Sequence, residues 1–458
     1  MRRKSHLLFS LISIVVVCLP SLNAFAQSPP KKRPELKQFG SSLKRLKWDP
    51  TLKQAVQTKQ DKKTDSLNEG DVVRIDTNLV TSDILVVDDK GRLVQNLTRD
   101  DFLVTEDGQA QEVGYFLRGD SESRPRTIVL IIDYSGCYAP FLRRSIDAAK
   151  VMVDKLAPHD VMAIVTDDVE MIVNFTDDKN KLKKKLEWLW ENHHMRLGAL
   201  AGTLGIDFKI GKGLTYSALM ATLKEAFIHE DLRPIIVFQT DGNQIFGLRD
   251  APTVNSAFQP DLPDELKAEH QRLLEKWKKK NPNPTFSTEF SVADVYRAVE
   301  KSRATIYTVV PGFQLIERTP DQQLKVMRKK TEFEMASFEE MYAPSEILAR
   351  KQVRDSYEKR RAFSPQNLMW AAQREIVMQD ALATVAAKTG GWTEFLENPE
   401  DADGVYNRIM TDINHRYIIG YYPTNKAHDG ARRKISIQLK GHPDYYVLGR
   451  SSYYPPAH

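Results

Sequence analysis

Unbroken runs of apolar residues predict strands that are buried on both faces of a sheet. The predicted central strands lie at residues 127–132, 161–165, 234–239 and 305–310, with an edge strand at 170–175. Apolar residues at helical spacing lie between and after them, at 141–156, 181–190, 216–228 and 292–301. Strands that alternate with helices predict a doubly wound, mostly parallel sheet, since parallel neighbours need a crossover connection.

The regions on either side of this pattern show an alternation of period two, which predicts antiparallel strands. The first region, 71–120, has strand-like runs and Gly-containing turns at 72–76, 84–87, 102–104 and 113–116. The last region, 416–458, has similar runs at 417–423, 434–439 and 445–448. We therefore expect a small antiparallel β module from the N-terminal strands, which the C-terminal strands could rejoin.

The α/β pattern extends over 124–415, with an interruption at about 311–365 that is charged and has no candidate strand. We expect this interruption to be a helical insertion. After it, a helix is predicted at 376–387, a short strand at 392–395 and a further helix at 402–413.

The N-terminal residues 1–26 have the pattern of a secretory signal peptide. Arg2, Arg3 and Lys4 precede an apolar run that is shorter than the ~20 residues of a spanning helix. We therefore expect a cleaved signal, an exported protein in the periplasm or outside the cell, and no transmembrane segment afterwards.

Net charge is distributed unevenly. The whole chain carries +5, whereas the Pro- and Lys-rich residues 27–70 contain 11 Lys and Arg against 5 Asp and Glu. The basic residues therefore belong to an N-terminal arm, which is expected to be a solvated linker or to contact an anionic envelope surface. The remainder, from residue 71 onward, is acidic, which argues against a nucleic-acid-binding domain.

Oxygen-bearing side chains follow the predicted central strands. Asp133 and Ser135 come directly after the strand at 127–132, followed by the thiol of Cys137, and Asp241 comes just after the strand at 234–239. Thr215 opens the intervening helix, where it could also serve only as a cap. Parallel strands place such residues at one edge of the sheet, and carboxylates with hydroxyls suit a hard divalent cation.

This arrangement resembles the metal-ion-dependent adhesion site (MIDAS) of von Willebrand factor A domains. Residues 97–102 and 106–108, Arg416-Tyr417, 420–423 and 453–455 extend the resemblance to the exported von Willebrand factor A-related proteins of Acidobacteria. The resemblance covers most of 71–458. It implies an A-type fold, no catalytic activity, and metal ligation by Asp133, Ser135, Thr215 and Asp241.

Cys137 departs from the adhesion-site pattern, in which this position carries a hydroxyl. A neutral thiol is a weak ligand for Mg²⁺, and a thiolate prefers softer metals. The expected cofactor is therefore Mg²⁺ or Mn²⁺, with Zn²⁺ binding or a lapsed site as alternatives. Cys18 lies in the predicted signal, so Cys137 would be the one thiol of the mature chain and no internal disulfide is expected.

Three functional hypotheses follow. The first is an adhesion-type binding protein whose cation engages an Asp or Glu carboxylate of an unknown partner protein, with Tyr134, Tyr138 and residues 192–213 at the rim. The second is an interaction scaffold with a degenerate metal site. The third, least favoured, is a hydrolase that uses Ser135 or a metal-bound water, because no His is adjacent in sequence to act as base.

Overall fold

In the computed structural model, the chain divides into two units, 1–35 and 36–458, and all of the described residues belong to the second. The described residues are 39–40, 42–43, 46–49, 54–57, 79–118, 126–135, 139–192, 214–227, 234–252, 290–341, 355 and 362–455. The predicted signal peptide and the predicted strand at 72–76 lie outside them.

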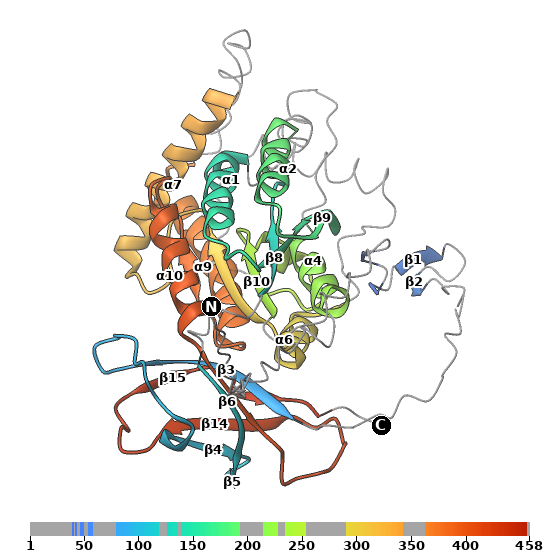
Figure 1. The fold of residues 1–458 in the computed structure, drawn as a ribbon. Helices are drawn as coiled ribbons and strands as arrows, with labels where there is room; N and C mark the ends of the chain where they lie inside the picture. The colour runs from blue at the N-terminus through green and yellow to red at the C-terminus, as the bar shows by residue number, and fades with distance from the viewer. Residues whose placement is uncertain are drawn as a thin grey trace, which may run out of the picture. The chain divides into compact units, whose positions relative to one another are not determined.

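A six-stranded sheet forms the centre of the α/β region (Figure 1). Its strand order is β12-β11-β10-β7-β8-β9, and only β9 runs antiparallel to its neighbour. The strands are β7 (Thr127–Ile132), β8 (Val161–Thr166), β9 (Glu170–Thr176), β10 (Pro234–Gln239), β11 (Thr305–Val310) and β12 (Thr393–Phe395). Every residue of β7, β10 and β11 is buried, as the apolar runs predicted.

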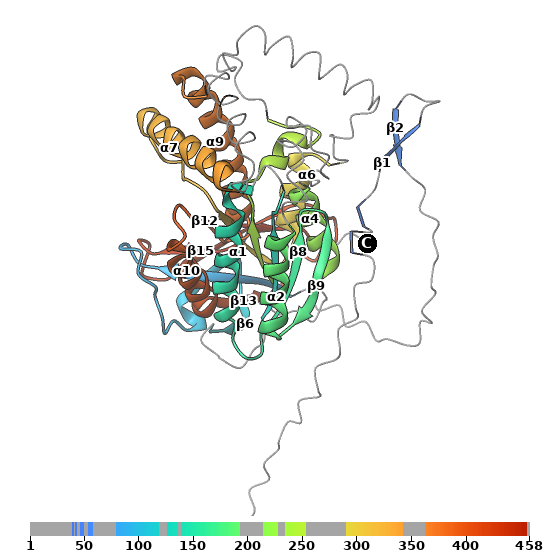
Figure 2. The same ribbon diagram turned by 90° about the horizontal axis from the view of Figure 1, so that it is seen from above.

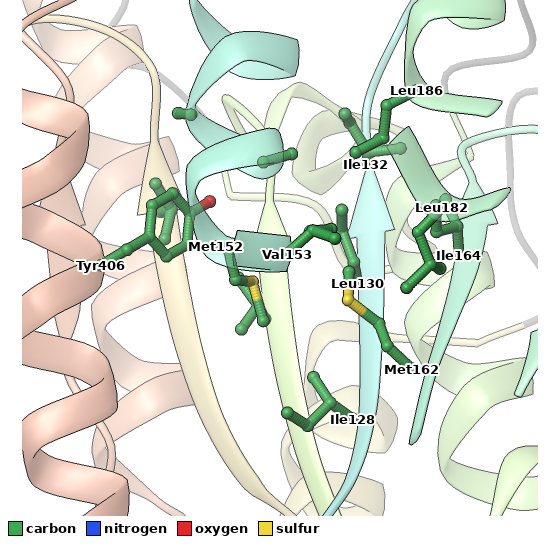
Figure 3. Packing of buried hydrophobic residues seen from close by; sticks show 14 of the residues in the cluster. Ile128, Leu130, Ile132, Met152, Val153, Met162, Ile164, Leu182, Leu186 and Tyr406 are labelled. Carbon is green, nitrogen blue, oxygen red and sulfur yellow. The ribbon is translucent and has the colours of Figure 1, made fainter. Parts of the chain in front are cut away.

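Helices cover both faces of this sheet. One face packs against α1 (Ala139–Asp154), α2 (Lys179–Glu191) and α10 (Asp401–His415). The other packs against α4 (Thr215–Ala221), α6 (Val292–Lys301) and α9 (Pro365–Ala387). Figure 3 shows the first interface, in which Leu130 of β7, Val153 of α1 and Tyr406 of α10 belong to one buried cluster. Burying each such side chain contributes about 1.5–3 kcal/mol.

The N-terminal and C-terminal strands pair in two four-stranded antiparallel sheets, ordered β15-β3-β13-β6 and β16-β14-β4-β5. A shared apolar core that includes Phe102, Val104, Tyr417 and Ile435 joins them into a sandwich. The strands are β3 (Val80–Val87), β4 (Phe102–Glu106), β5 (Gln109–Gln111), β6 (Val113–Leu117), β13 (Tyr417–Tyr421), β14 (Arg433–Leu439), β15 (Tyr446–Leu448) and β16 (Ser452–Tyr453), with a 3-10 turn at Arg99–Asp101. The predicted fold class is confirmed, and the C-terminal strands do rejoin the β module.

A buried arginine links the α/β region to the sandwich. Arg416 lies between α10 and β13 and is 1% exposed. Its guanidinium forms an ion pair with Asp412 of α10 and donates to the carbonyl oxygens of Asp83 in β3 and of Gly390. The hydroxyl of Tyr307 in β11 also donates to Asp412. Each buried charge in this network therefore has a partner.

The predicted helical insertion contains α7 (Pro320–Met341), and α7 packs beside α9 (Figure 2). The helix predicted to begin at 376 begins instead at Pro365. Ser364 caps it by accepting a hydrogen bond from the N–H of Asn367 at 3.2 Å, and a proline at the first helical position is favoured. Apolar spacing alone missed this start, although Leu368 and Ala372 in the first turns are buried.

Two other elements differ from the prediction. The helix predicted over 216–228 is α-helical only to Ala221 and then forms a π-helical segment, Thr222–Ala226. Within the predicted linker, Leu46–Asp49 (β1) and Gln54–Gln57 (β2) pair antiparallel. Among the described residues, no helix is long and apolar enough to cross a membrane.

Candidate metal-binding edge of the sheet

The candidate site lies where β7, β8 and β10 end, which we call the carboxyl edge. Ile132 of β7 and Gln239 of β10 are paired in register, and the N–H of Asp133 donates to the carbonyl of Gln239 at 3.0 Å. Asp133 and Asp241 therefore leave adjacent parallel strands at the same edge, as the sequence predicted.

Asp133 is buried, with 2% of its surface exposed. One carboxylate oxygen accepts from the N–H of Ser135 at 2.9 Å, and the other accepts from the hydroxyl of Thr240 at 2.9 Å. Burial and, after it, the charge of Asp241 raise the pKa of Asp133 to about 6, against the opposing effect of these hydrogen bonds. The charge of Asp241 therefore opposes ionisation of Asp133.

Asp241 is half-buried and accepts a hydrogen bond from the N–H of Asn243 at 2.8 Å. Burial, together with the charges of Glu375 and Glu334, raises its pKa to about 6 as well, against the opposing effect of the Asn243 N–H and the Lys330 ammonium. Within the part of the chain that the structure describes, neither Asp133 nor Asp241 forms an ion pair. A divalent cation would relieve their repulsion.

Thr215 lies at the start of α4, and two hydrogen-bonded loops hold it against this edge. The N–H of Leu214 donates to the carbonyl of Asp167, whose carboxylate accepts from the N–H of Tyr134 at 3.3 Å. On the other side, Gln244 accepts from the N–H of Ser217 at 3.1 Å. The start of α4 is therefore tied both to the loop after β7 and to the loop after β10.

The hydroxyl of Thr215 is buried and has no hydrogen-bond partner among the described residues. The capping alternative for this residue is not supported, since the cap position of α4 is Leu214 and has no side-chain cap. Thr166, at the end of β8, also has a buried hydroxyl without a partner in the described chain. A buried polar atom without a partner costs about 1–3 kcal/mol, and a cation ligated by the hydroxyl oxygen would remove that cost.

Ser135 is buried beside Asp133, with 8% of its surface exposed. Cys137 and Tyr138 lie outside the described residues, as do 193–213 of the predicted rim. Tyr134 is 7% exposed, and its hydroxyl donates to Asp168 at 3.3 Å, so its prediction as an exposed rim residue is wrong. The described residues contain no group of three or more His, Cys, Asp or Glu side chains suited to a metal, so the candidate ligands are two carboxylates with hydroxyls.

Helix α9 forms a wall of the site that the sequence pattern did not predict. A backbone oxygen of Met378 and the side chain of Leu382, both in α9, lie against Gly242. Arg374 of α9 donates to Asn243 at 3.2 Å, just beyond Asp241. These contacts fix the Asp241 loop, which continues as a 3-10 turn at Asn243–Gly247. No spacing in the sequence connects α9 to residue 241, so only the fold could reveal this contact.

A half-buried ion cluster on the same wall influences Asp241. Lys330 of α7 bonds Glu334 at 2.6 Å and Glu375 of α9 at 2.8 Å. Burial alone would lower the pKa of Lys330, but the two glutamates raise it above its ordinary value. Since Lys330 is held charged and both its carboxylates act on Asp241, the wall adds two negative groups and one positive group to the carboxyl edge.

No protein-family model matches the chain, and no curated protein matches it. Among solved structures, it is similar to an aerotolerance-related membrane protein from Bacteroides fragilis, with 10% identity, a TM-score of 0.29, and coverage of 63% of this chain and 98% of that one. It is also similar to a von Willebrand factor type A protein from Catenulispora acidiphila, with 9% identity, a TM-score of 0.29, and coverage of 83% and 74%. A third similar structure is the PilB minor pilin from Streptococcus sanguinis, with 12% identity, a TM-score of 0.29, and coverage of 63% and 61%.

Proposed function

We propose that this chain is an exported binding protein that holds a divalent cation at its carboxyl edge and uses it to engage a carboxylate of a partner protein. The cation would be held by Asp133, Ser135, Thr215 and Asp241, with Cys137 at the fifth position. When bound, the cation supplies an open coordination position for an acidic side chain. No catalytic step is part of the proposal.

The first observation that carries the proposal is the buried Thr215 hydroxyl, which has no partner in the described chain and starts a helix tied by hydrogen bonds to the loops after β8 and β10. The second is the buried Asp133 carboxylate, whose pKa is raised by burial and by the charge of Asp241. A structural cap would hydrogen-bond its own helix, and a structural carboxylate pair would have a cationic partner. Both features are explained together by one cation. The preference between Mg²⁺ and Mn²⁺ depends on Cys137, because a sulfur ligand favours softer ions.

The chain's own residues would perform two tasks. Thr240 and the N–H of Ser135 orient the Asp133 carboxylate, and Asn243 orients that of Asp241. The helical wall formed by α7 and α9 bounds one side of the edge, so a partner would approach past the loops after β7 and β8. Charge on the wall, from Lys330 and its two glutamates, would then help to select that partner.

The first test measures the melting temperature of the exported chain in chelator, Mg²⁺, Mn²⁺ and Zn²⁺. A cation at a hundredfold excess over its Kd stabilises the folded state by about 2.7 kcal/mol. We expect a metal-dependent rise that Asp133→Ala abolishes, with Glu170→Ala on the exposed β9 edge as a matched control that keeps it. Absence of a rise with every metal would refute the cation site and favour a scaffold with a lapsed site.

The second test examines the open position. Mn²⁺ bound to the protein relaxes water protons, and acetate serves as the simplest carboxylate probe. Acetate should lower the relaxation enhancement by replacing bound water, while an equal concentration of chloride should not. If Mn²⁺ binds but acetate leaves the relaxation unchanged, the cation is structural and the partner contact must lie elsewhere.

A further inference from the structure

A groove of about 780 Å³ follows the outer edge of β12, at the end of the six-stranded sheet. Its floor is the backbone of 391–395, one wall is α9 and the other is α10. It shares no residue with the candidate cation site, and its far end is bounded by the loop after β11, with Gln314 and Glu317. The groove is therefore a separate surface with its own chemistry.

The floor of the groove presents unpaired main-chain groups. Trp392 accepts a hydrogen bond from the N–H of Thr308, and Leu396 donates to Val310, so alternate residues of β12 point their backbone toward β11. The ladder therefore directs the N–H and C=O groups of Thr393 and Phe395 away from β11, into the groove. No described residue bonds to these groups, so β12 is an open edge able to pair with another strand.

Both walls leave room for an added strand. The α9 wall presents Ala383 and Ala387, which are four residues apart and hence on one face of the helix, and the α10 wall presents Gly404. A neighbouring strand lies about 4.8 Å from its partner, and small side chains on both sides permit that approach. Large residues at these three positions would block that approach. Natural proteins commonly protect an open strand edge, and this edge lacks such a cover among the described residues.

The groove differs in polarity between its two sides. Glu394, on the α10 side of β12, is buried and paired with Arg408, and Glu400 is exposed near the start of α10. Glu317, Glu397 and Asp401 bring the lining to five carboxylates against one guanidinium. The α9 side is lined by alanine methyl groups. An added strand would thus meet acidic groups with one set of alternate side chains and an apolar wall with the other.

We propose that this groove binds an extended, basic segment of a partner protein, which adds to β12 as a seventh strand of the sheet. Alternate lysines or arginines of the segment meet the carboxylates on the α10 side, and small apolar residues between them meet Ala383 and Ala387. Main-chain bonds to Thr393 and Phe395 supply affinity, and the charge pattern supplies selection. This binding is independent of the cation.

The test uses the full exported chain and a labelled seven-residue peptide that alternates Lys with Val. Fluorescence polarisation measures binding, and backbone ¹⁵N NMR reports the amides of Thr393 and Phe395. We expect saturable binding with shifts of those two amides. Methylating alternate backbone nitrogens of the peptide keeps its charge but removes the paired N–H groups, so it should weaken binding by about tenfold or more.

Variants of exposed lining residues separate the contribution of charge to peptide binding from that of the open space in the groove. The double change Glu317→Lys with Glu400→Lys should weaken the peptide by about tenfold. Ala387→Trp should weaken it to a similar extent by filling the groove. Glu170→Lys, on the opposite edge strand β9, is the matched control and should leave it unchanged. Each variant's circular dichroism and melting temperature are compared with those of the parent chain.

Four results would overturn the proposal. Equal binding of the methylated peptide would mean that charge alone holds it. Spermine is a flexible polycation with no peptide backbone. If it displaced the labelled peptide as well as the unlabelled peptide does, charge alone would again account for the binding. Unchanged binding in Ala387→Trp, or absence of shifts at Thr393 and Phe395, would place any bound peptide outside the groove.

Discussion

Buried carboxylates occur in two regions of this molecule, in opposite states. In the sandwich, Glu106 accepts from Arg433 at 3.2 Å and from the hydroxyls of Tyr421 and Tyr453 at 2.8 and 2.9 Å. At the carboxyl edge, Asp133 accepts only neutral donors, and its charged neighbour is another carboxylate, Asp241. The first group has its cation within the fold, whereas Asp133 and Asp241 have no cationic partner among the described residues.

This difference separates structural charges from candidate binding charges. A buried ion pair with satisfied hydrogen bonds holds its surroundings in one arrangement, and removing one partner is costly. A buried carboxylate pair without a cation has a raised pKa and is kept at a cost to stability, which is typical of functional sites. The same comparison predicts which substitutions destabilise the fold and which stabilise it.

The largest effect is expected at Arg416. Arg416→Ala leaves Asp412 buried and without its cationic partner, so the free energy of unfolding should fall by about 3–5 kcal/mol. Urea denaturation measures this change. Arg143→Ala is the control, since Arg143 is exposed and its pairs with Asp147 and Glu187 contribute about 1 kcal/mol or less. Equal losses in the two variants would contradict the structural role of Arg416.

A smaller loss is expected at Glu106. Glu106→Gln removes the negative charge but keeps the shape, and Arg433 retains the carbonyl oxygens of Asn425 and Ala427. The free energy of unfolding should fall by about 2 kcal/mol, because the buried cation loses its buried counter-charge and keeps only the more exposed Asp429, at 3.7 Å. Metal-dependent stabilisation should not change. If it did, the sandwich and the carboxyl edge would be coupled, and the distinction between the two regions would fail.

The pH dependence of the metal-free protein tests the raised pKa values. Asp133 and Asp241 bind protons more tightly when folded, because their pKa is about 6 in the folded chain. Their stabilising contribution is therefore present at low pH and is lost as the pH rises through about 6.

Relative to the double variant Asp133→Asn with Asp241→Asn, the parent chain in chelator should lose about 2–3 kcal/mol between about pH 5 and pH 7.5. Melting curves across this range measure the difference. With saturating Mg²⁺, the parent chain should instead gain stability relative to the double variant as the pH rises, since cation binding requires deprotonated carboxylates. A difference that does not depend on pH would refute the raised pKa values.

The smallest effect is expected at Thr215. Thr215→Val replaces a hydroxyl that has no partner among the described residues with a methyl group of similar size. The metal-free chain should therefore become more stable by about 1 kcal/mol, while its metal-dependent stabilisation should decrease. Thr222→Val is the matched control, because the Thr222 hydroxyl is paired with the carbonyl of Ala218 at 2.8 Å. If both variants stabilised the chain equally, the gain at Thr215 could not be assigned to the loss of a hydroxyl without a partner.

The sequence predicted the sheet well because burial on both faces leaves an unbroken apolar run. The bounds of β7, β10 and β11 agree with the prediction to the residue. Asp133 and Asp241 were likewise placed correctly at one edge, since a parallel ladder determines that placement. The early start of α9 depends on a Ser-Pro cap, and its contact with the Asp241 loop joins segments over 130 residues apart. Such contacts leave no period in a sequence.

Strands β6 and β13 are hydrogen-bonded neighbours, with Leu117 paired with Ile418, although they lie about 300 residues apart in the chain. The whole α/β region is thus inserted between two adjacent strands, at a position where a hairpin would need only a short turn. Closing so long a loop carries a large entropy cost while the loop is unfolded. A folded insert brings its own ends together first, so we expect the α/β region to fold before the sandwich closes around its termini.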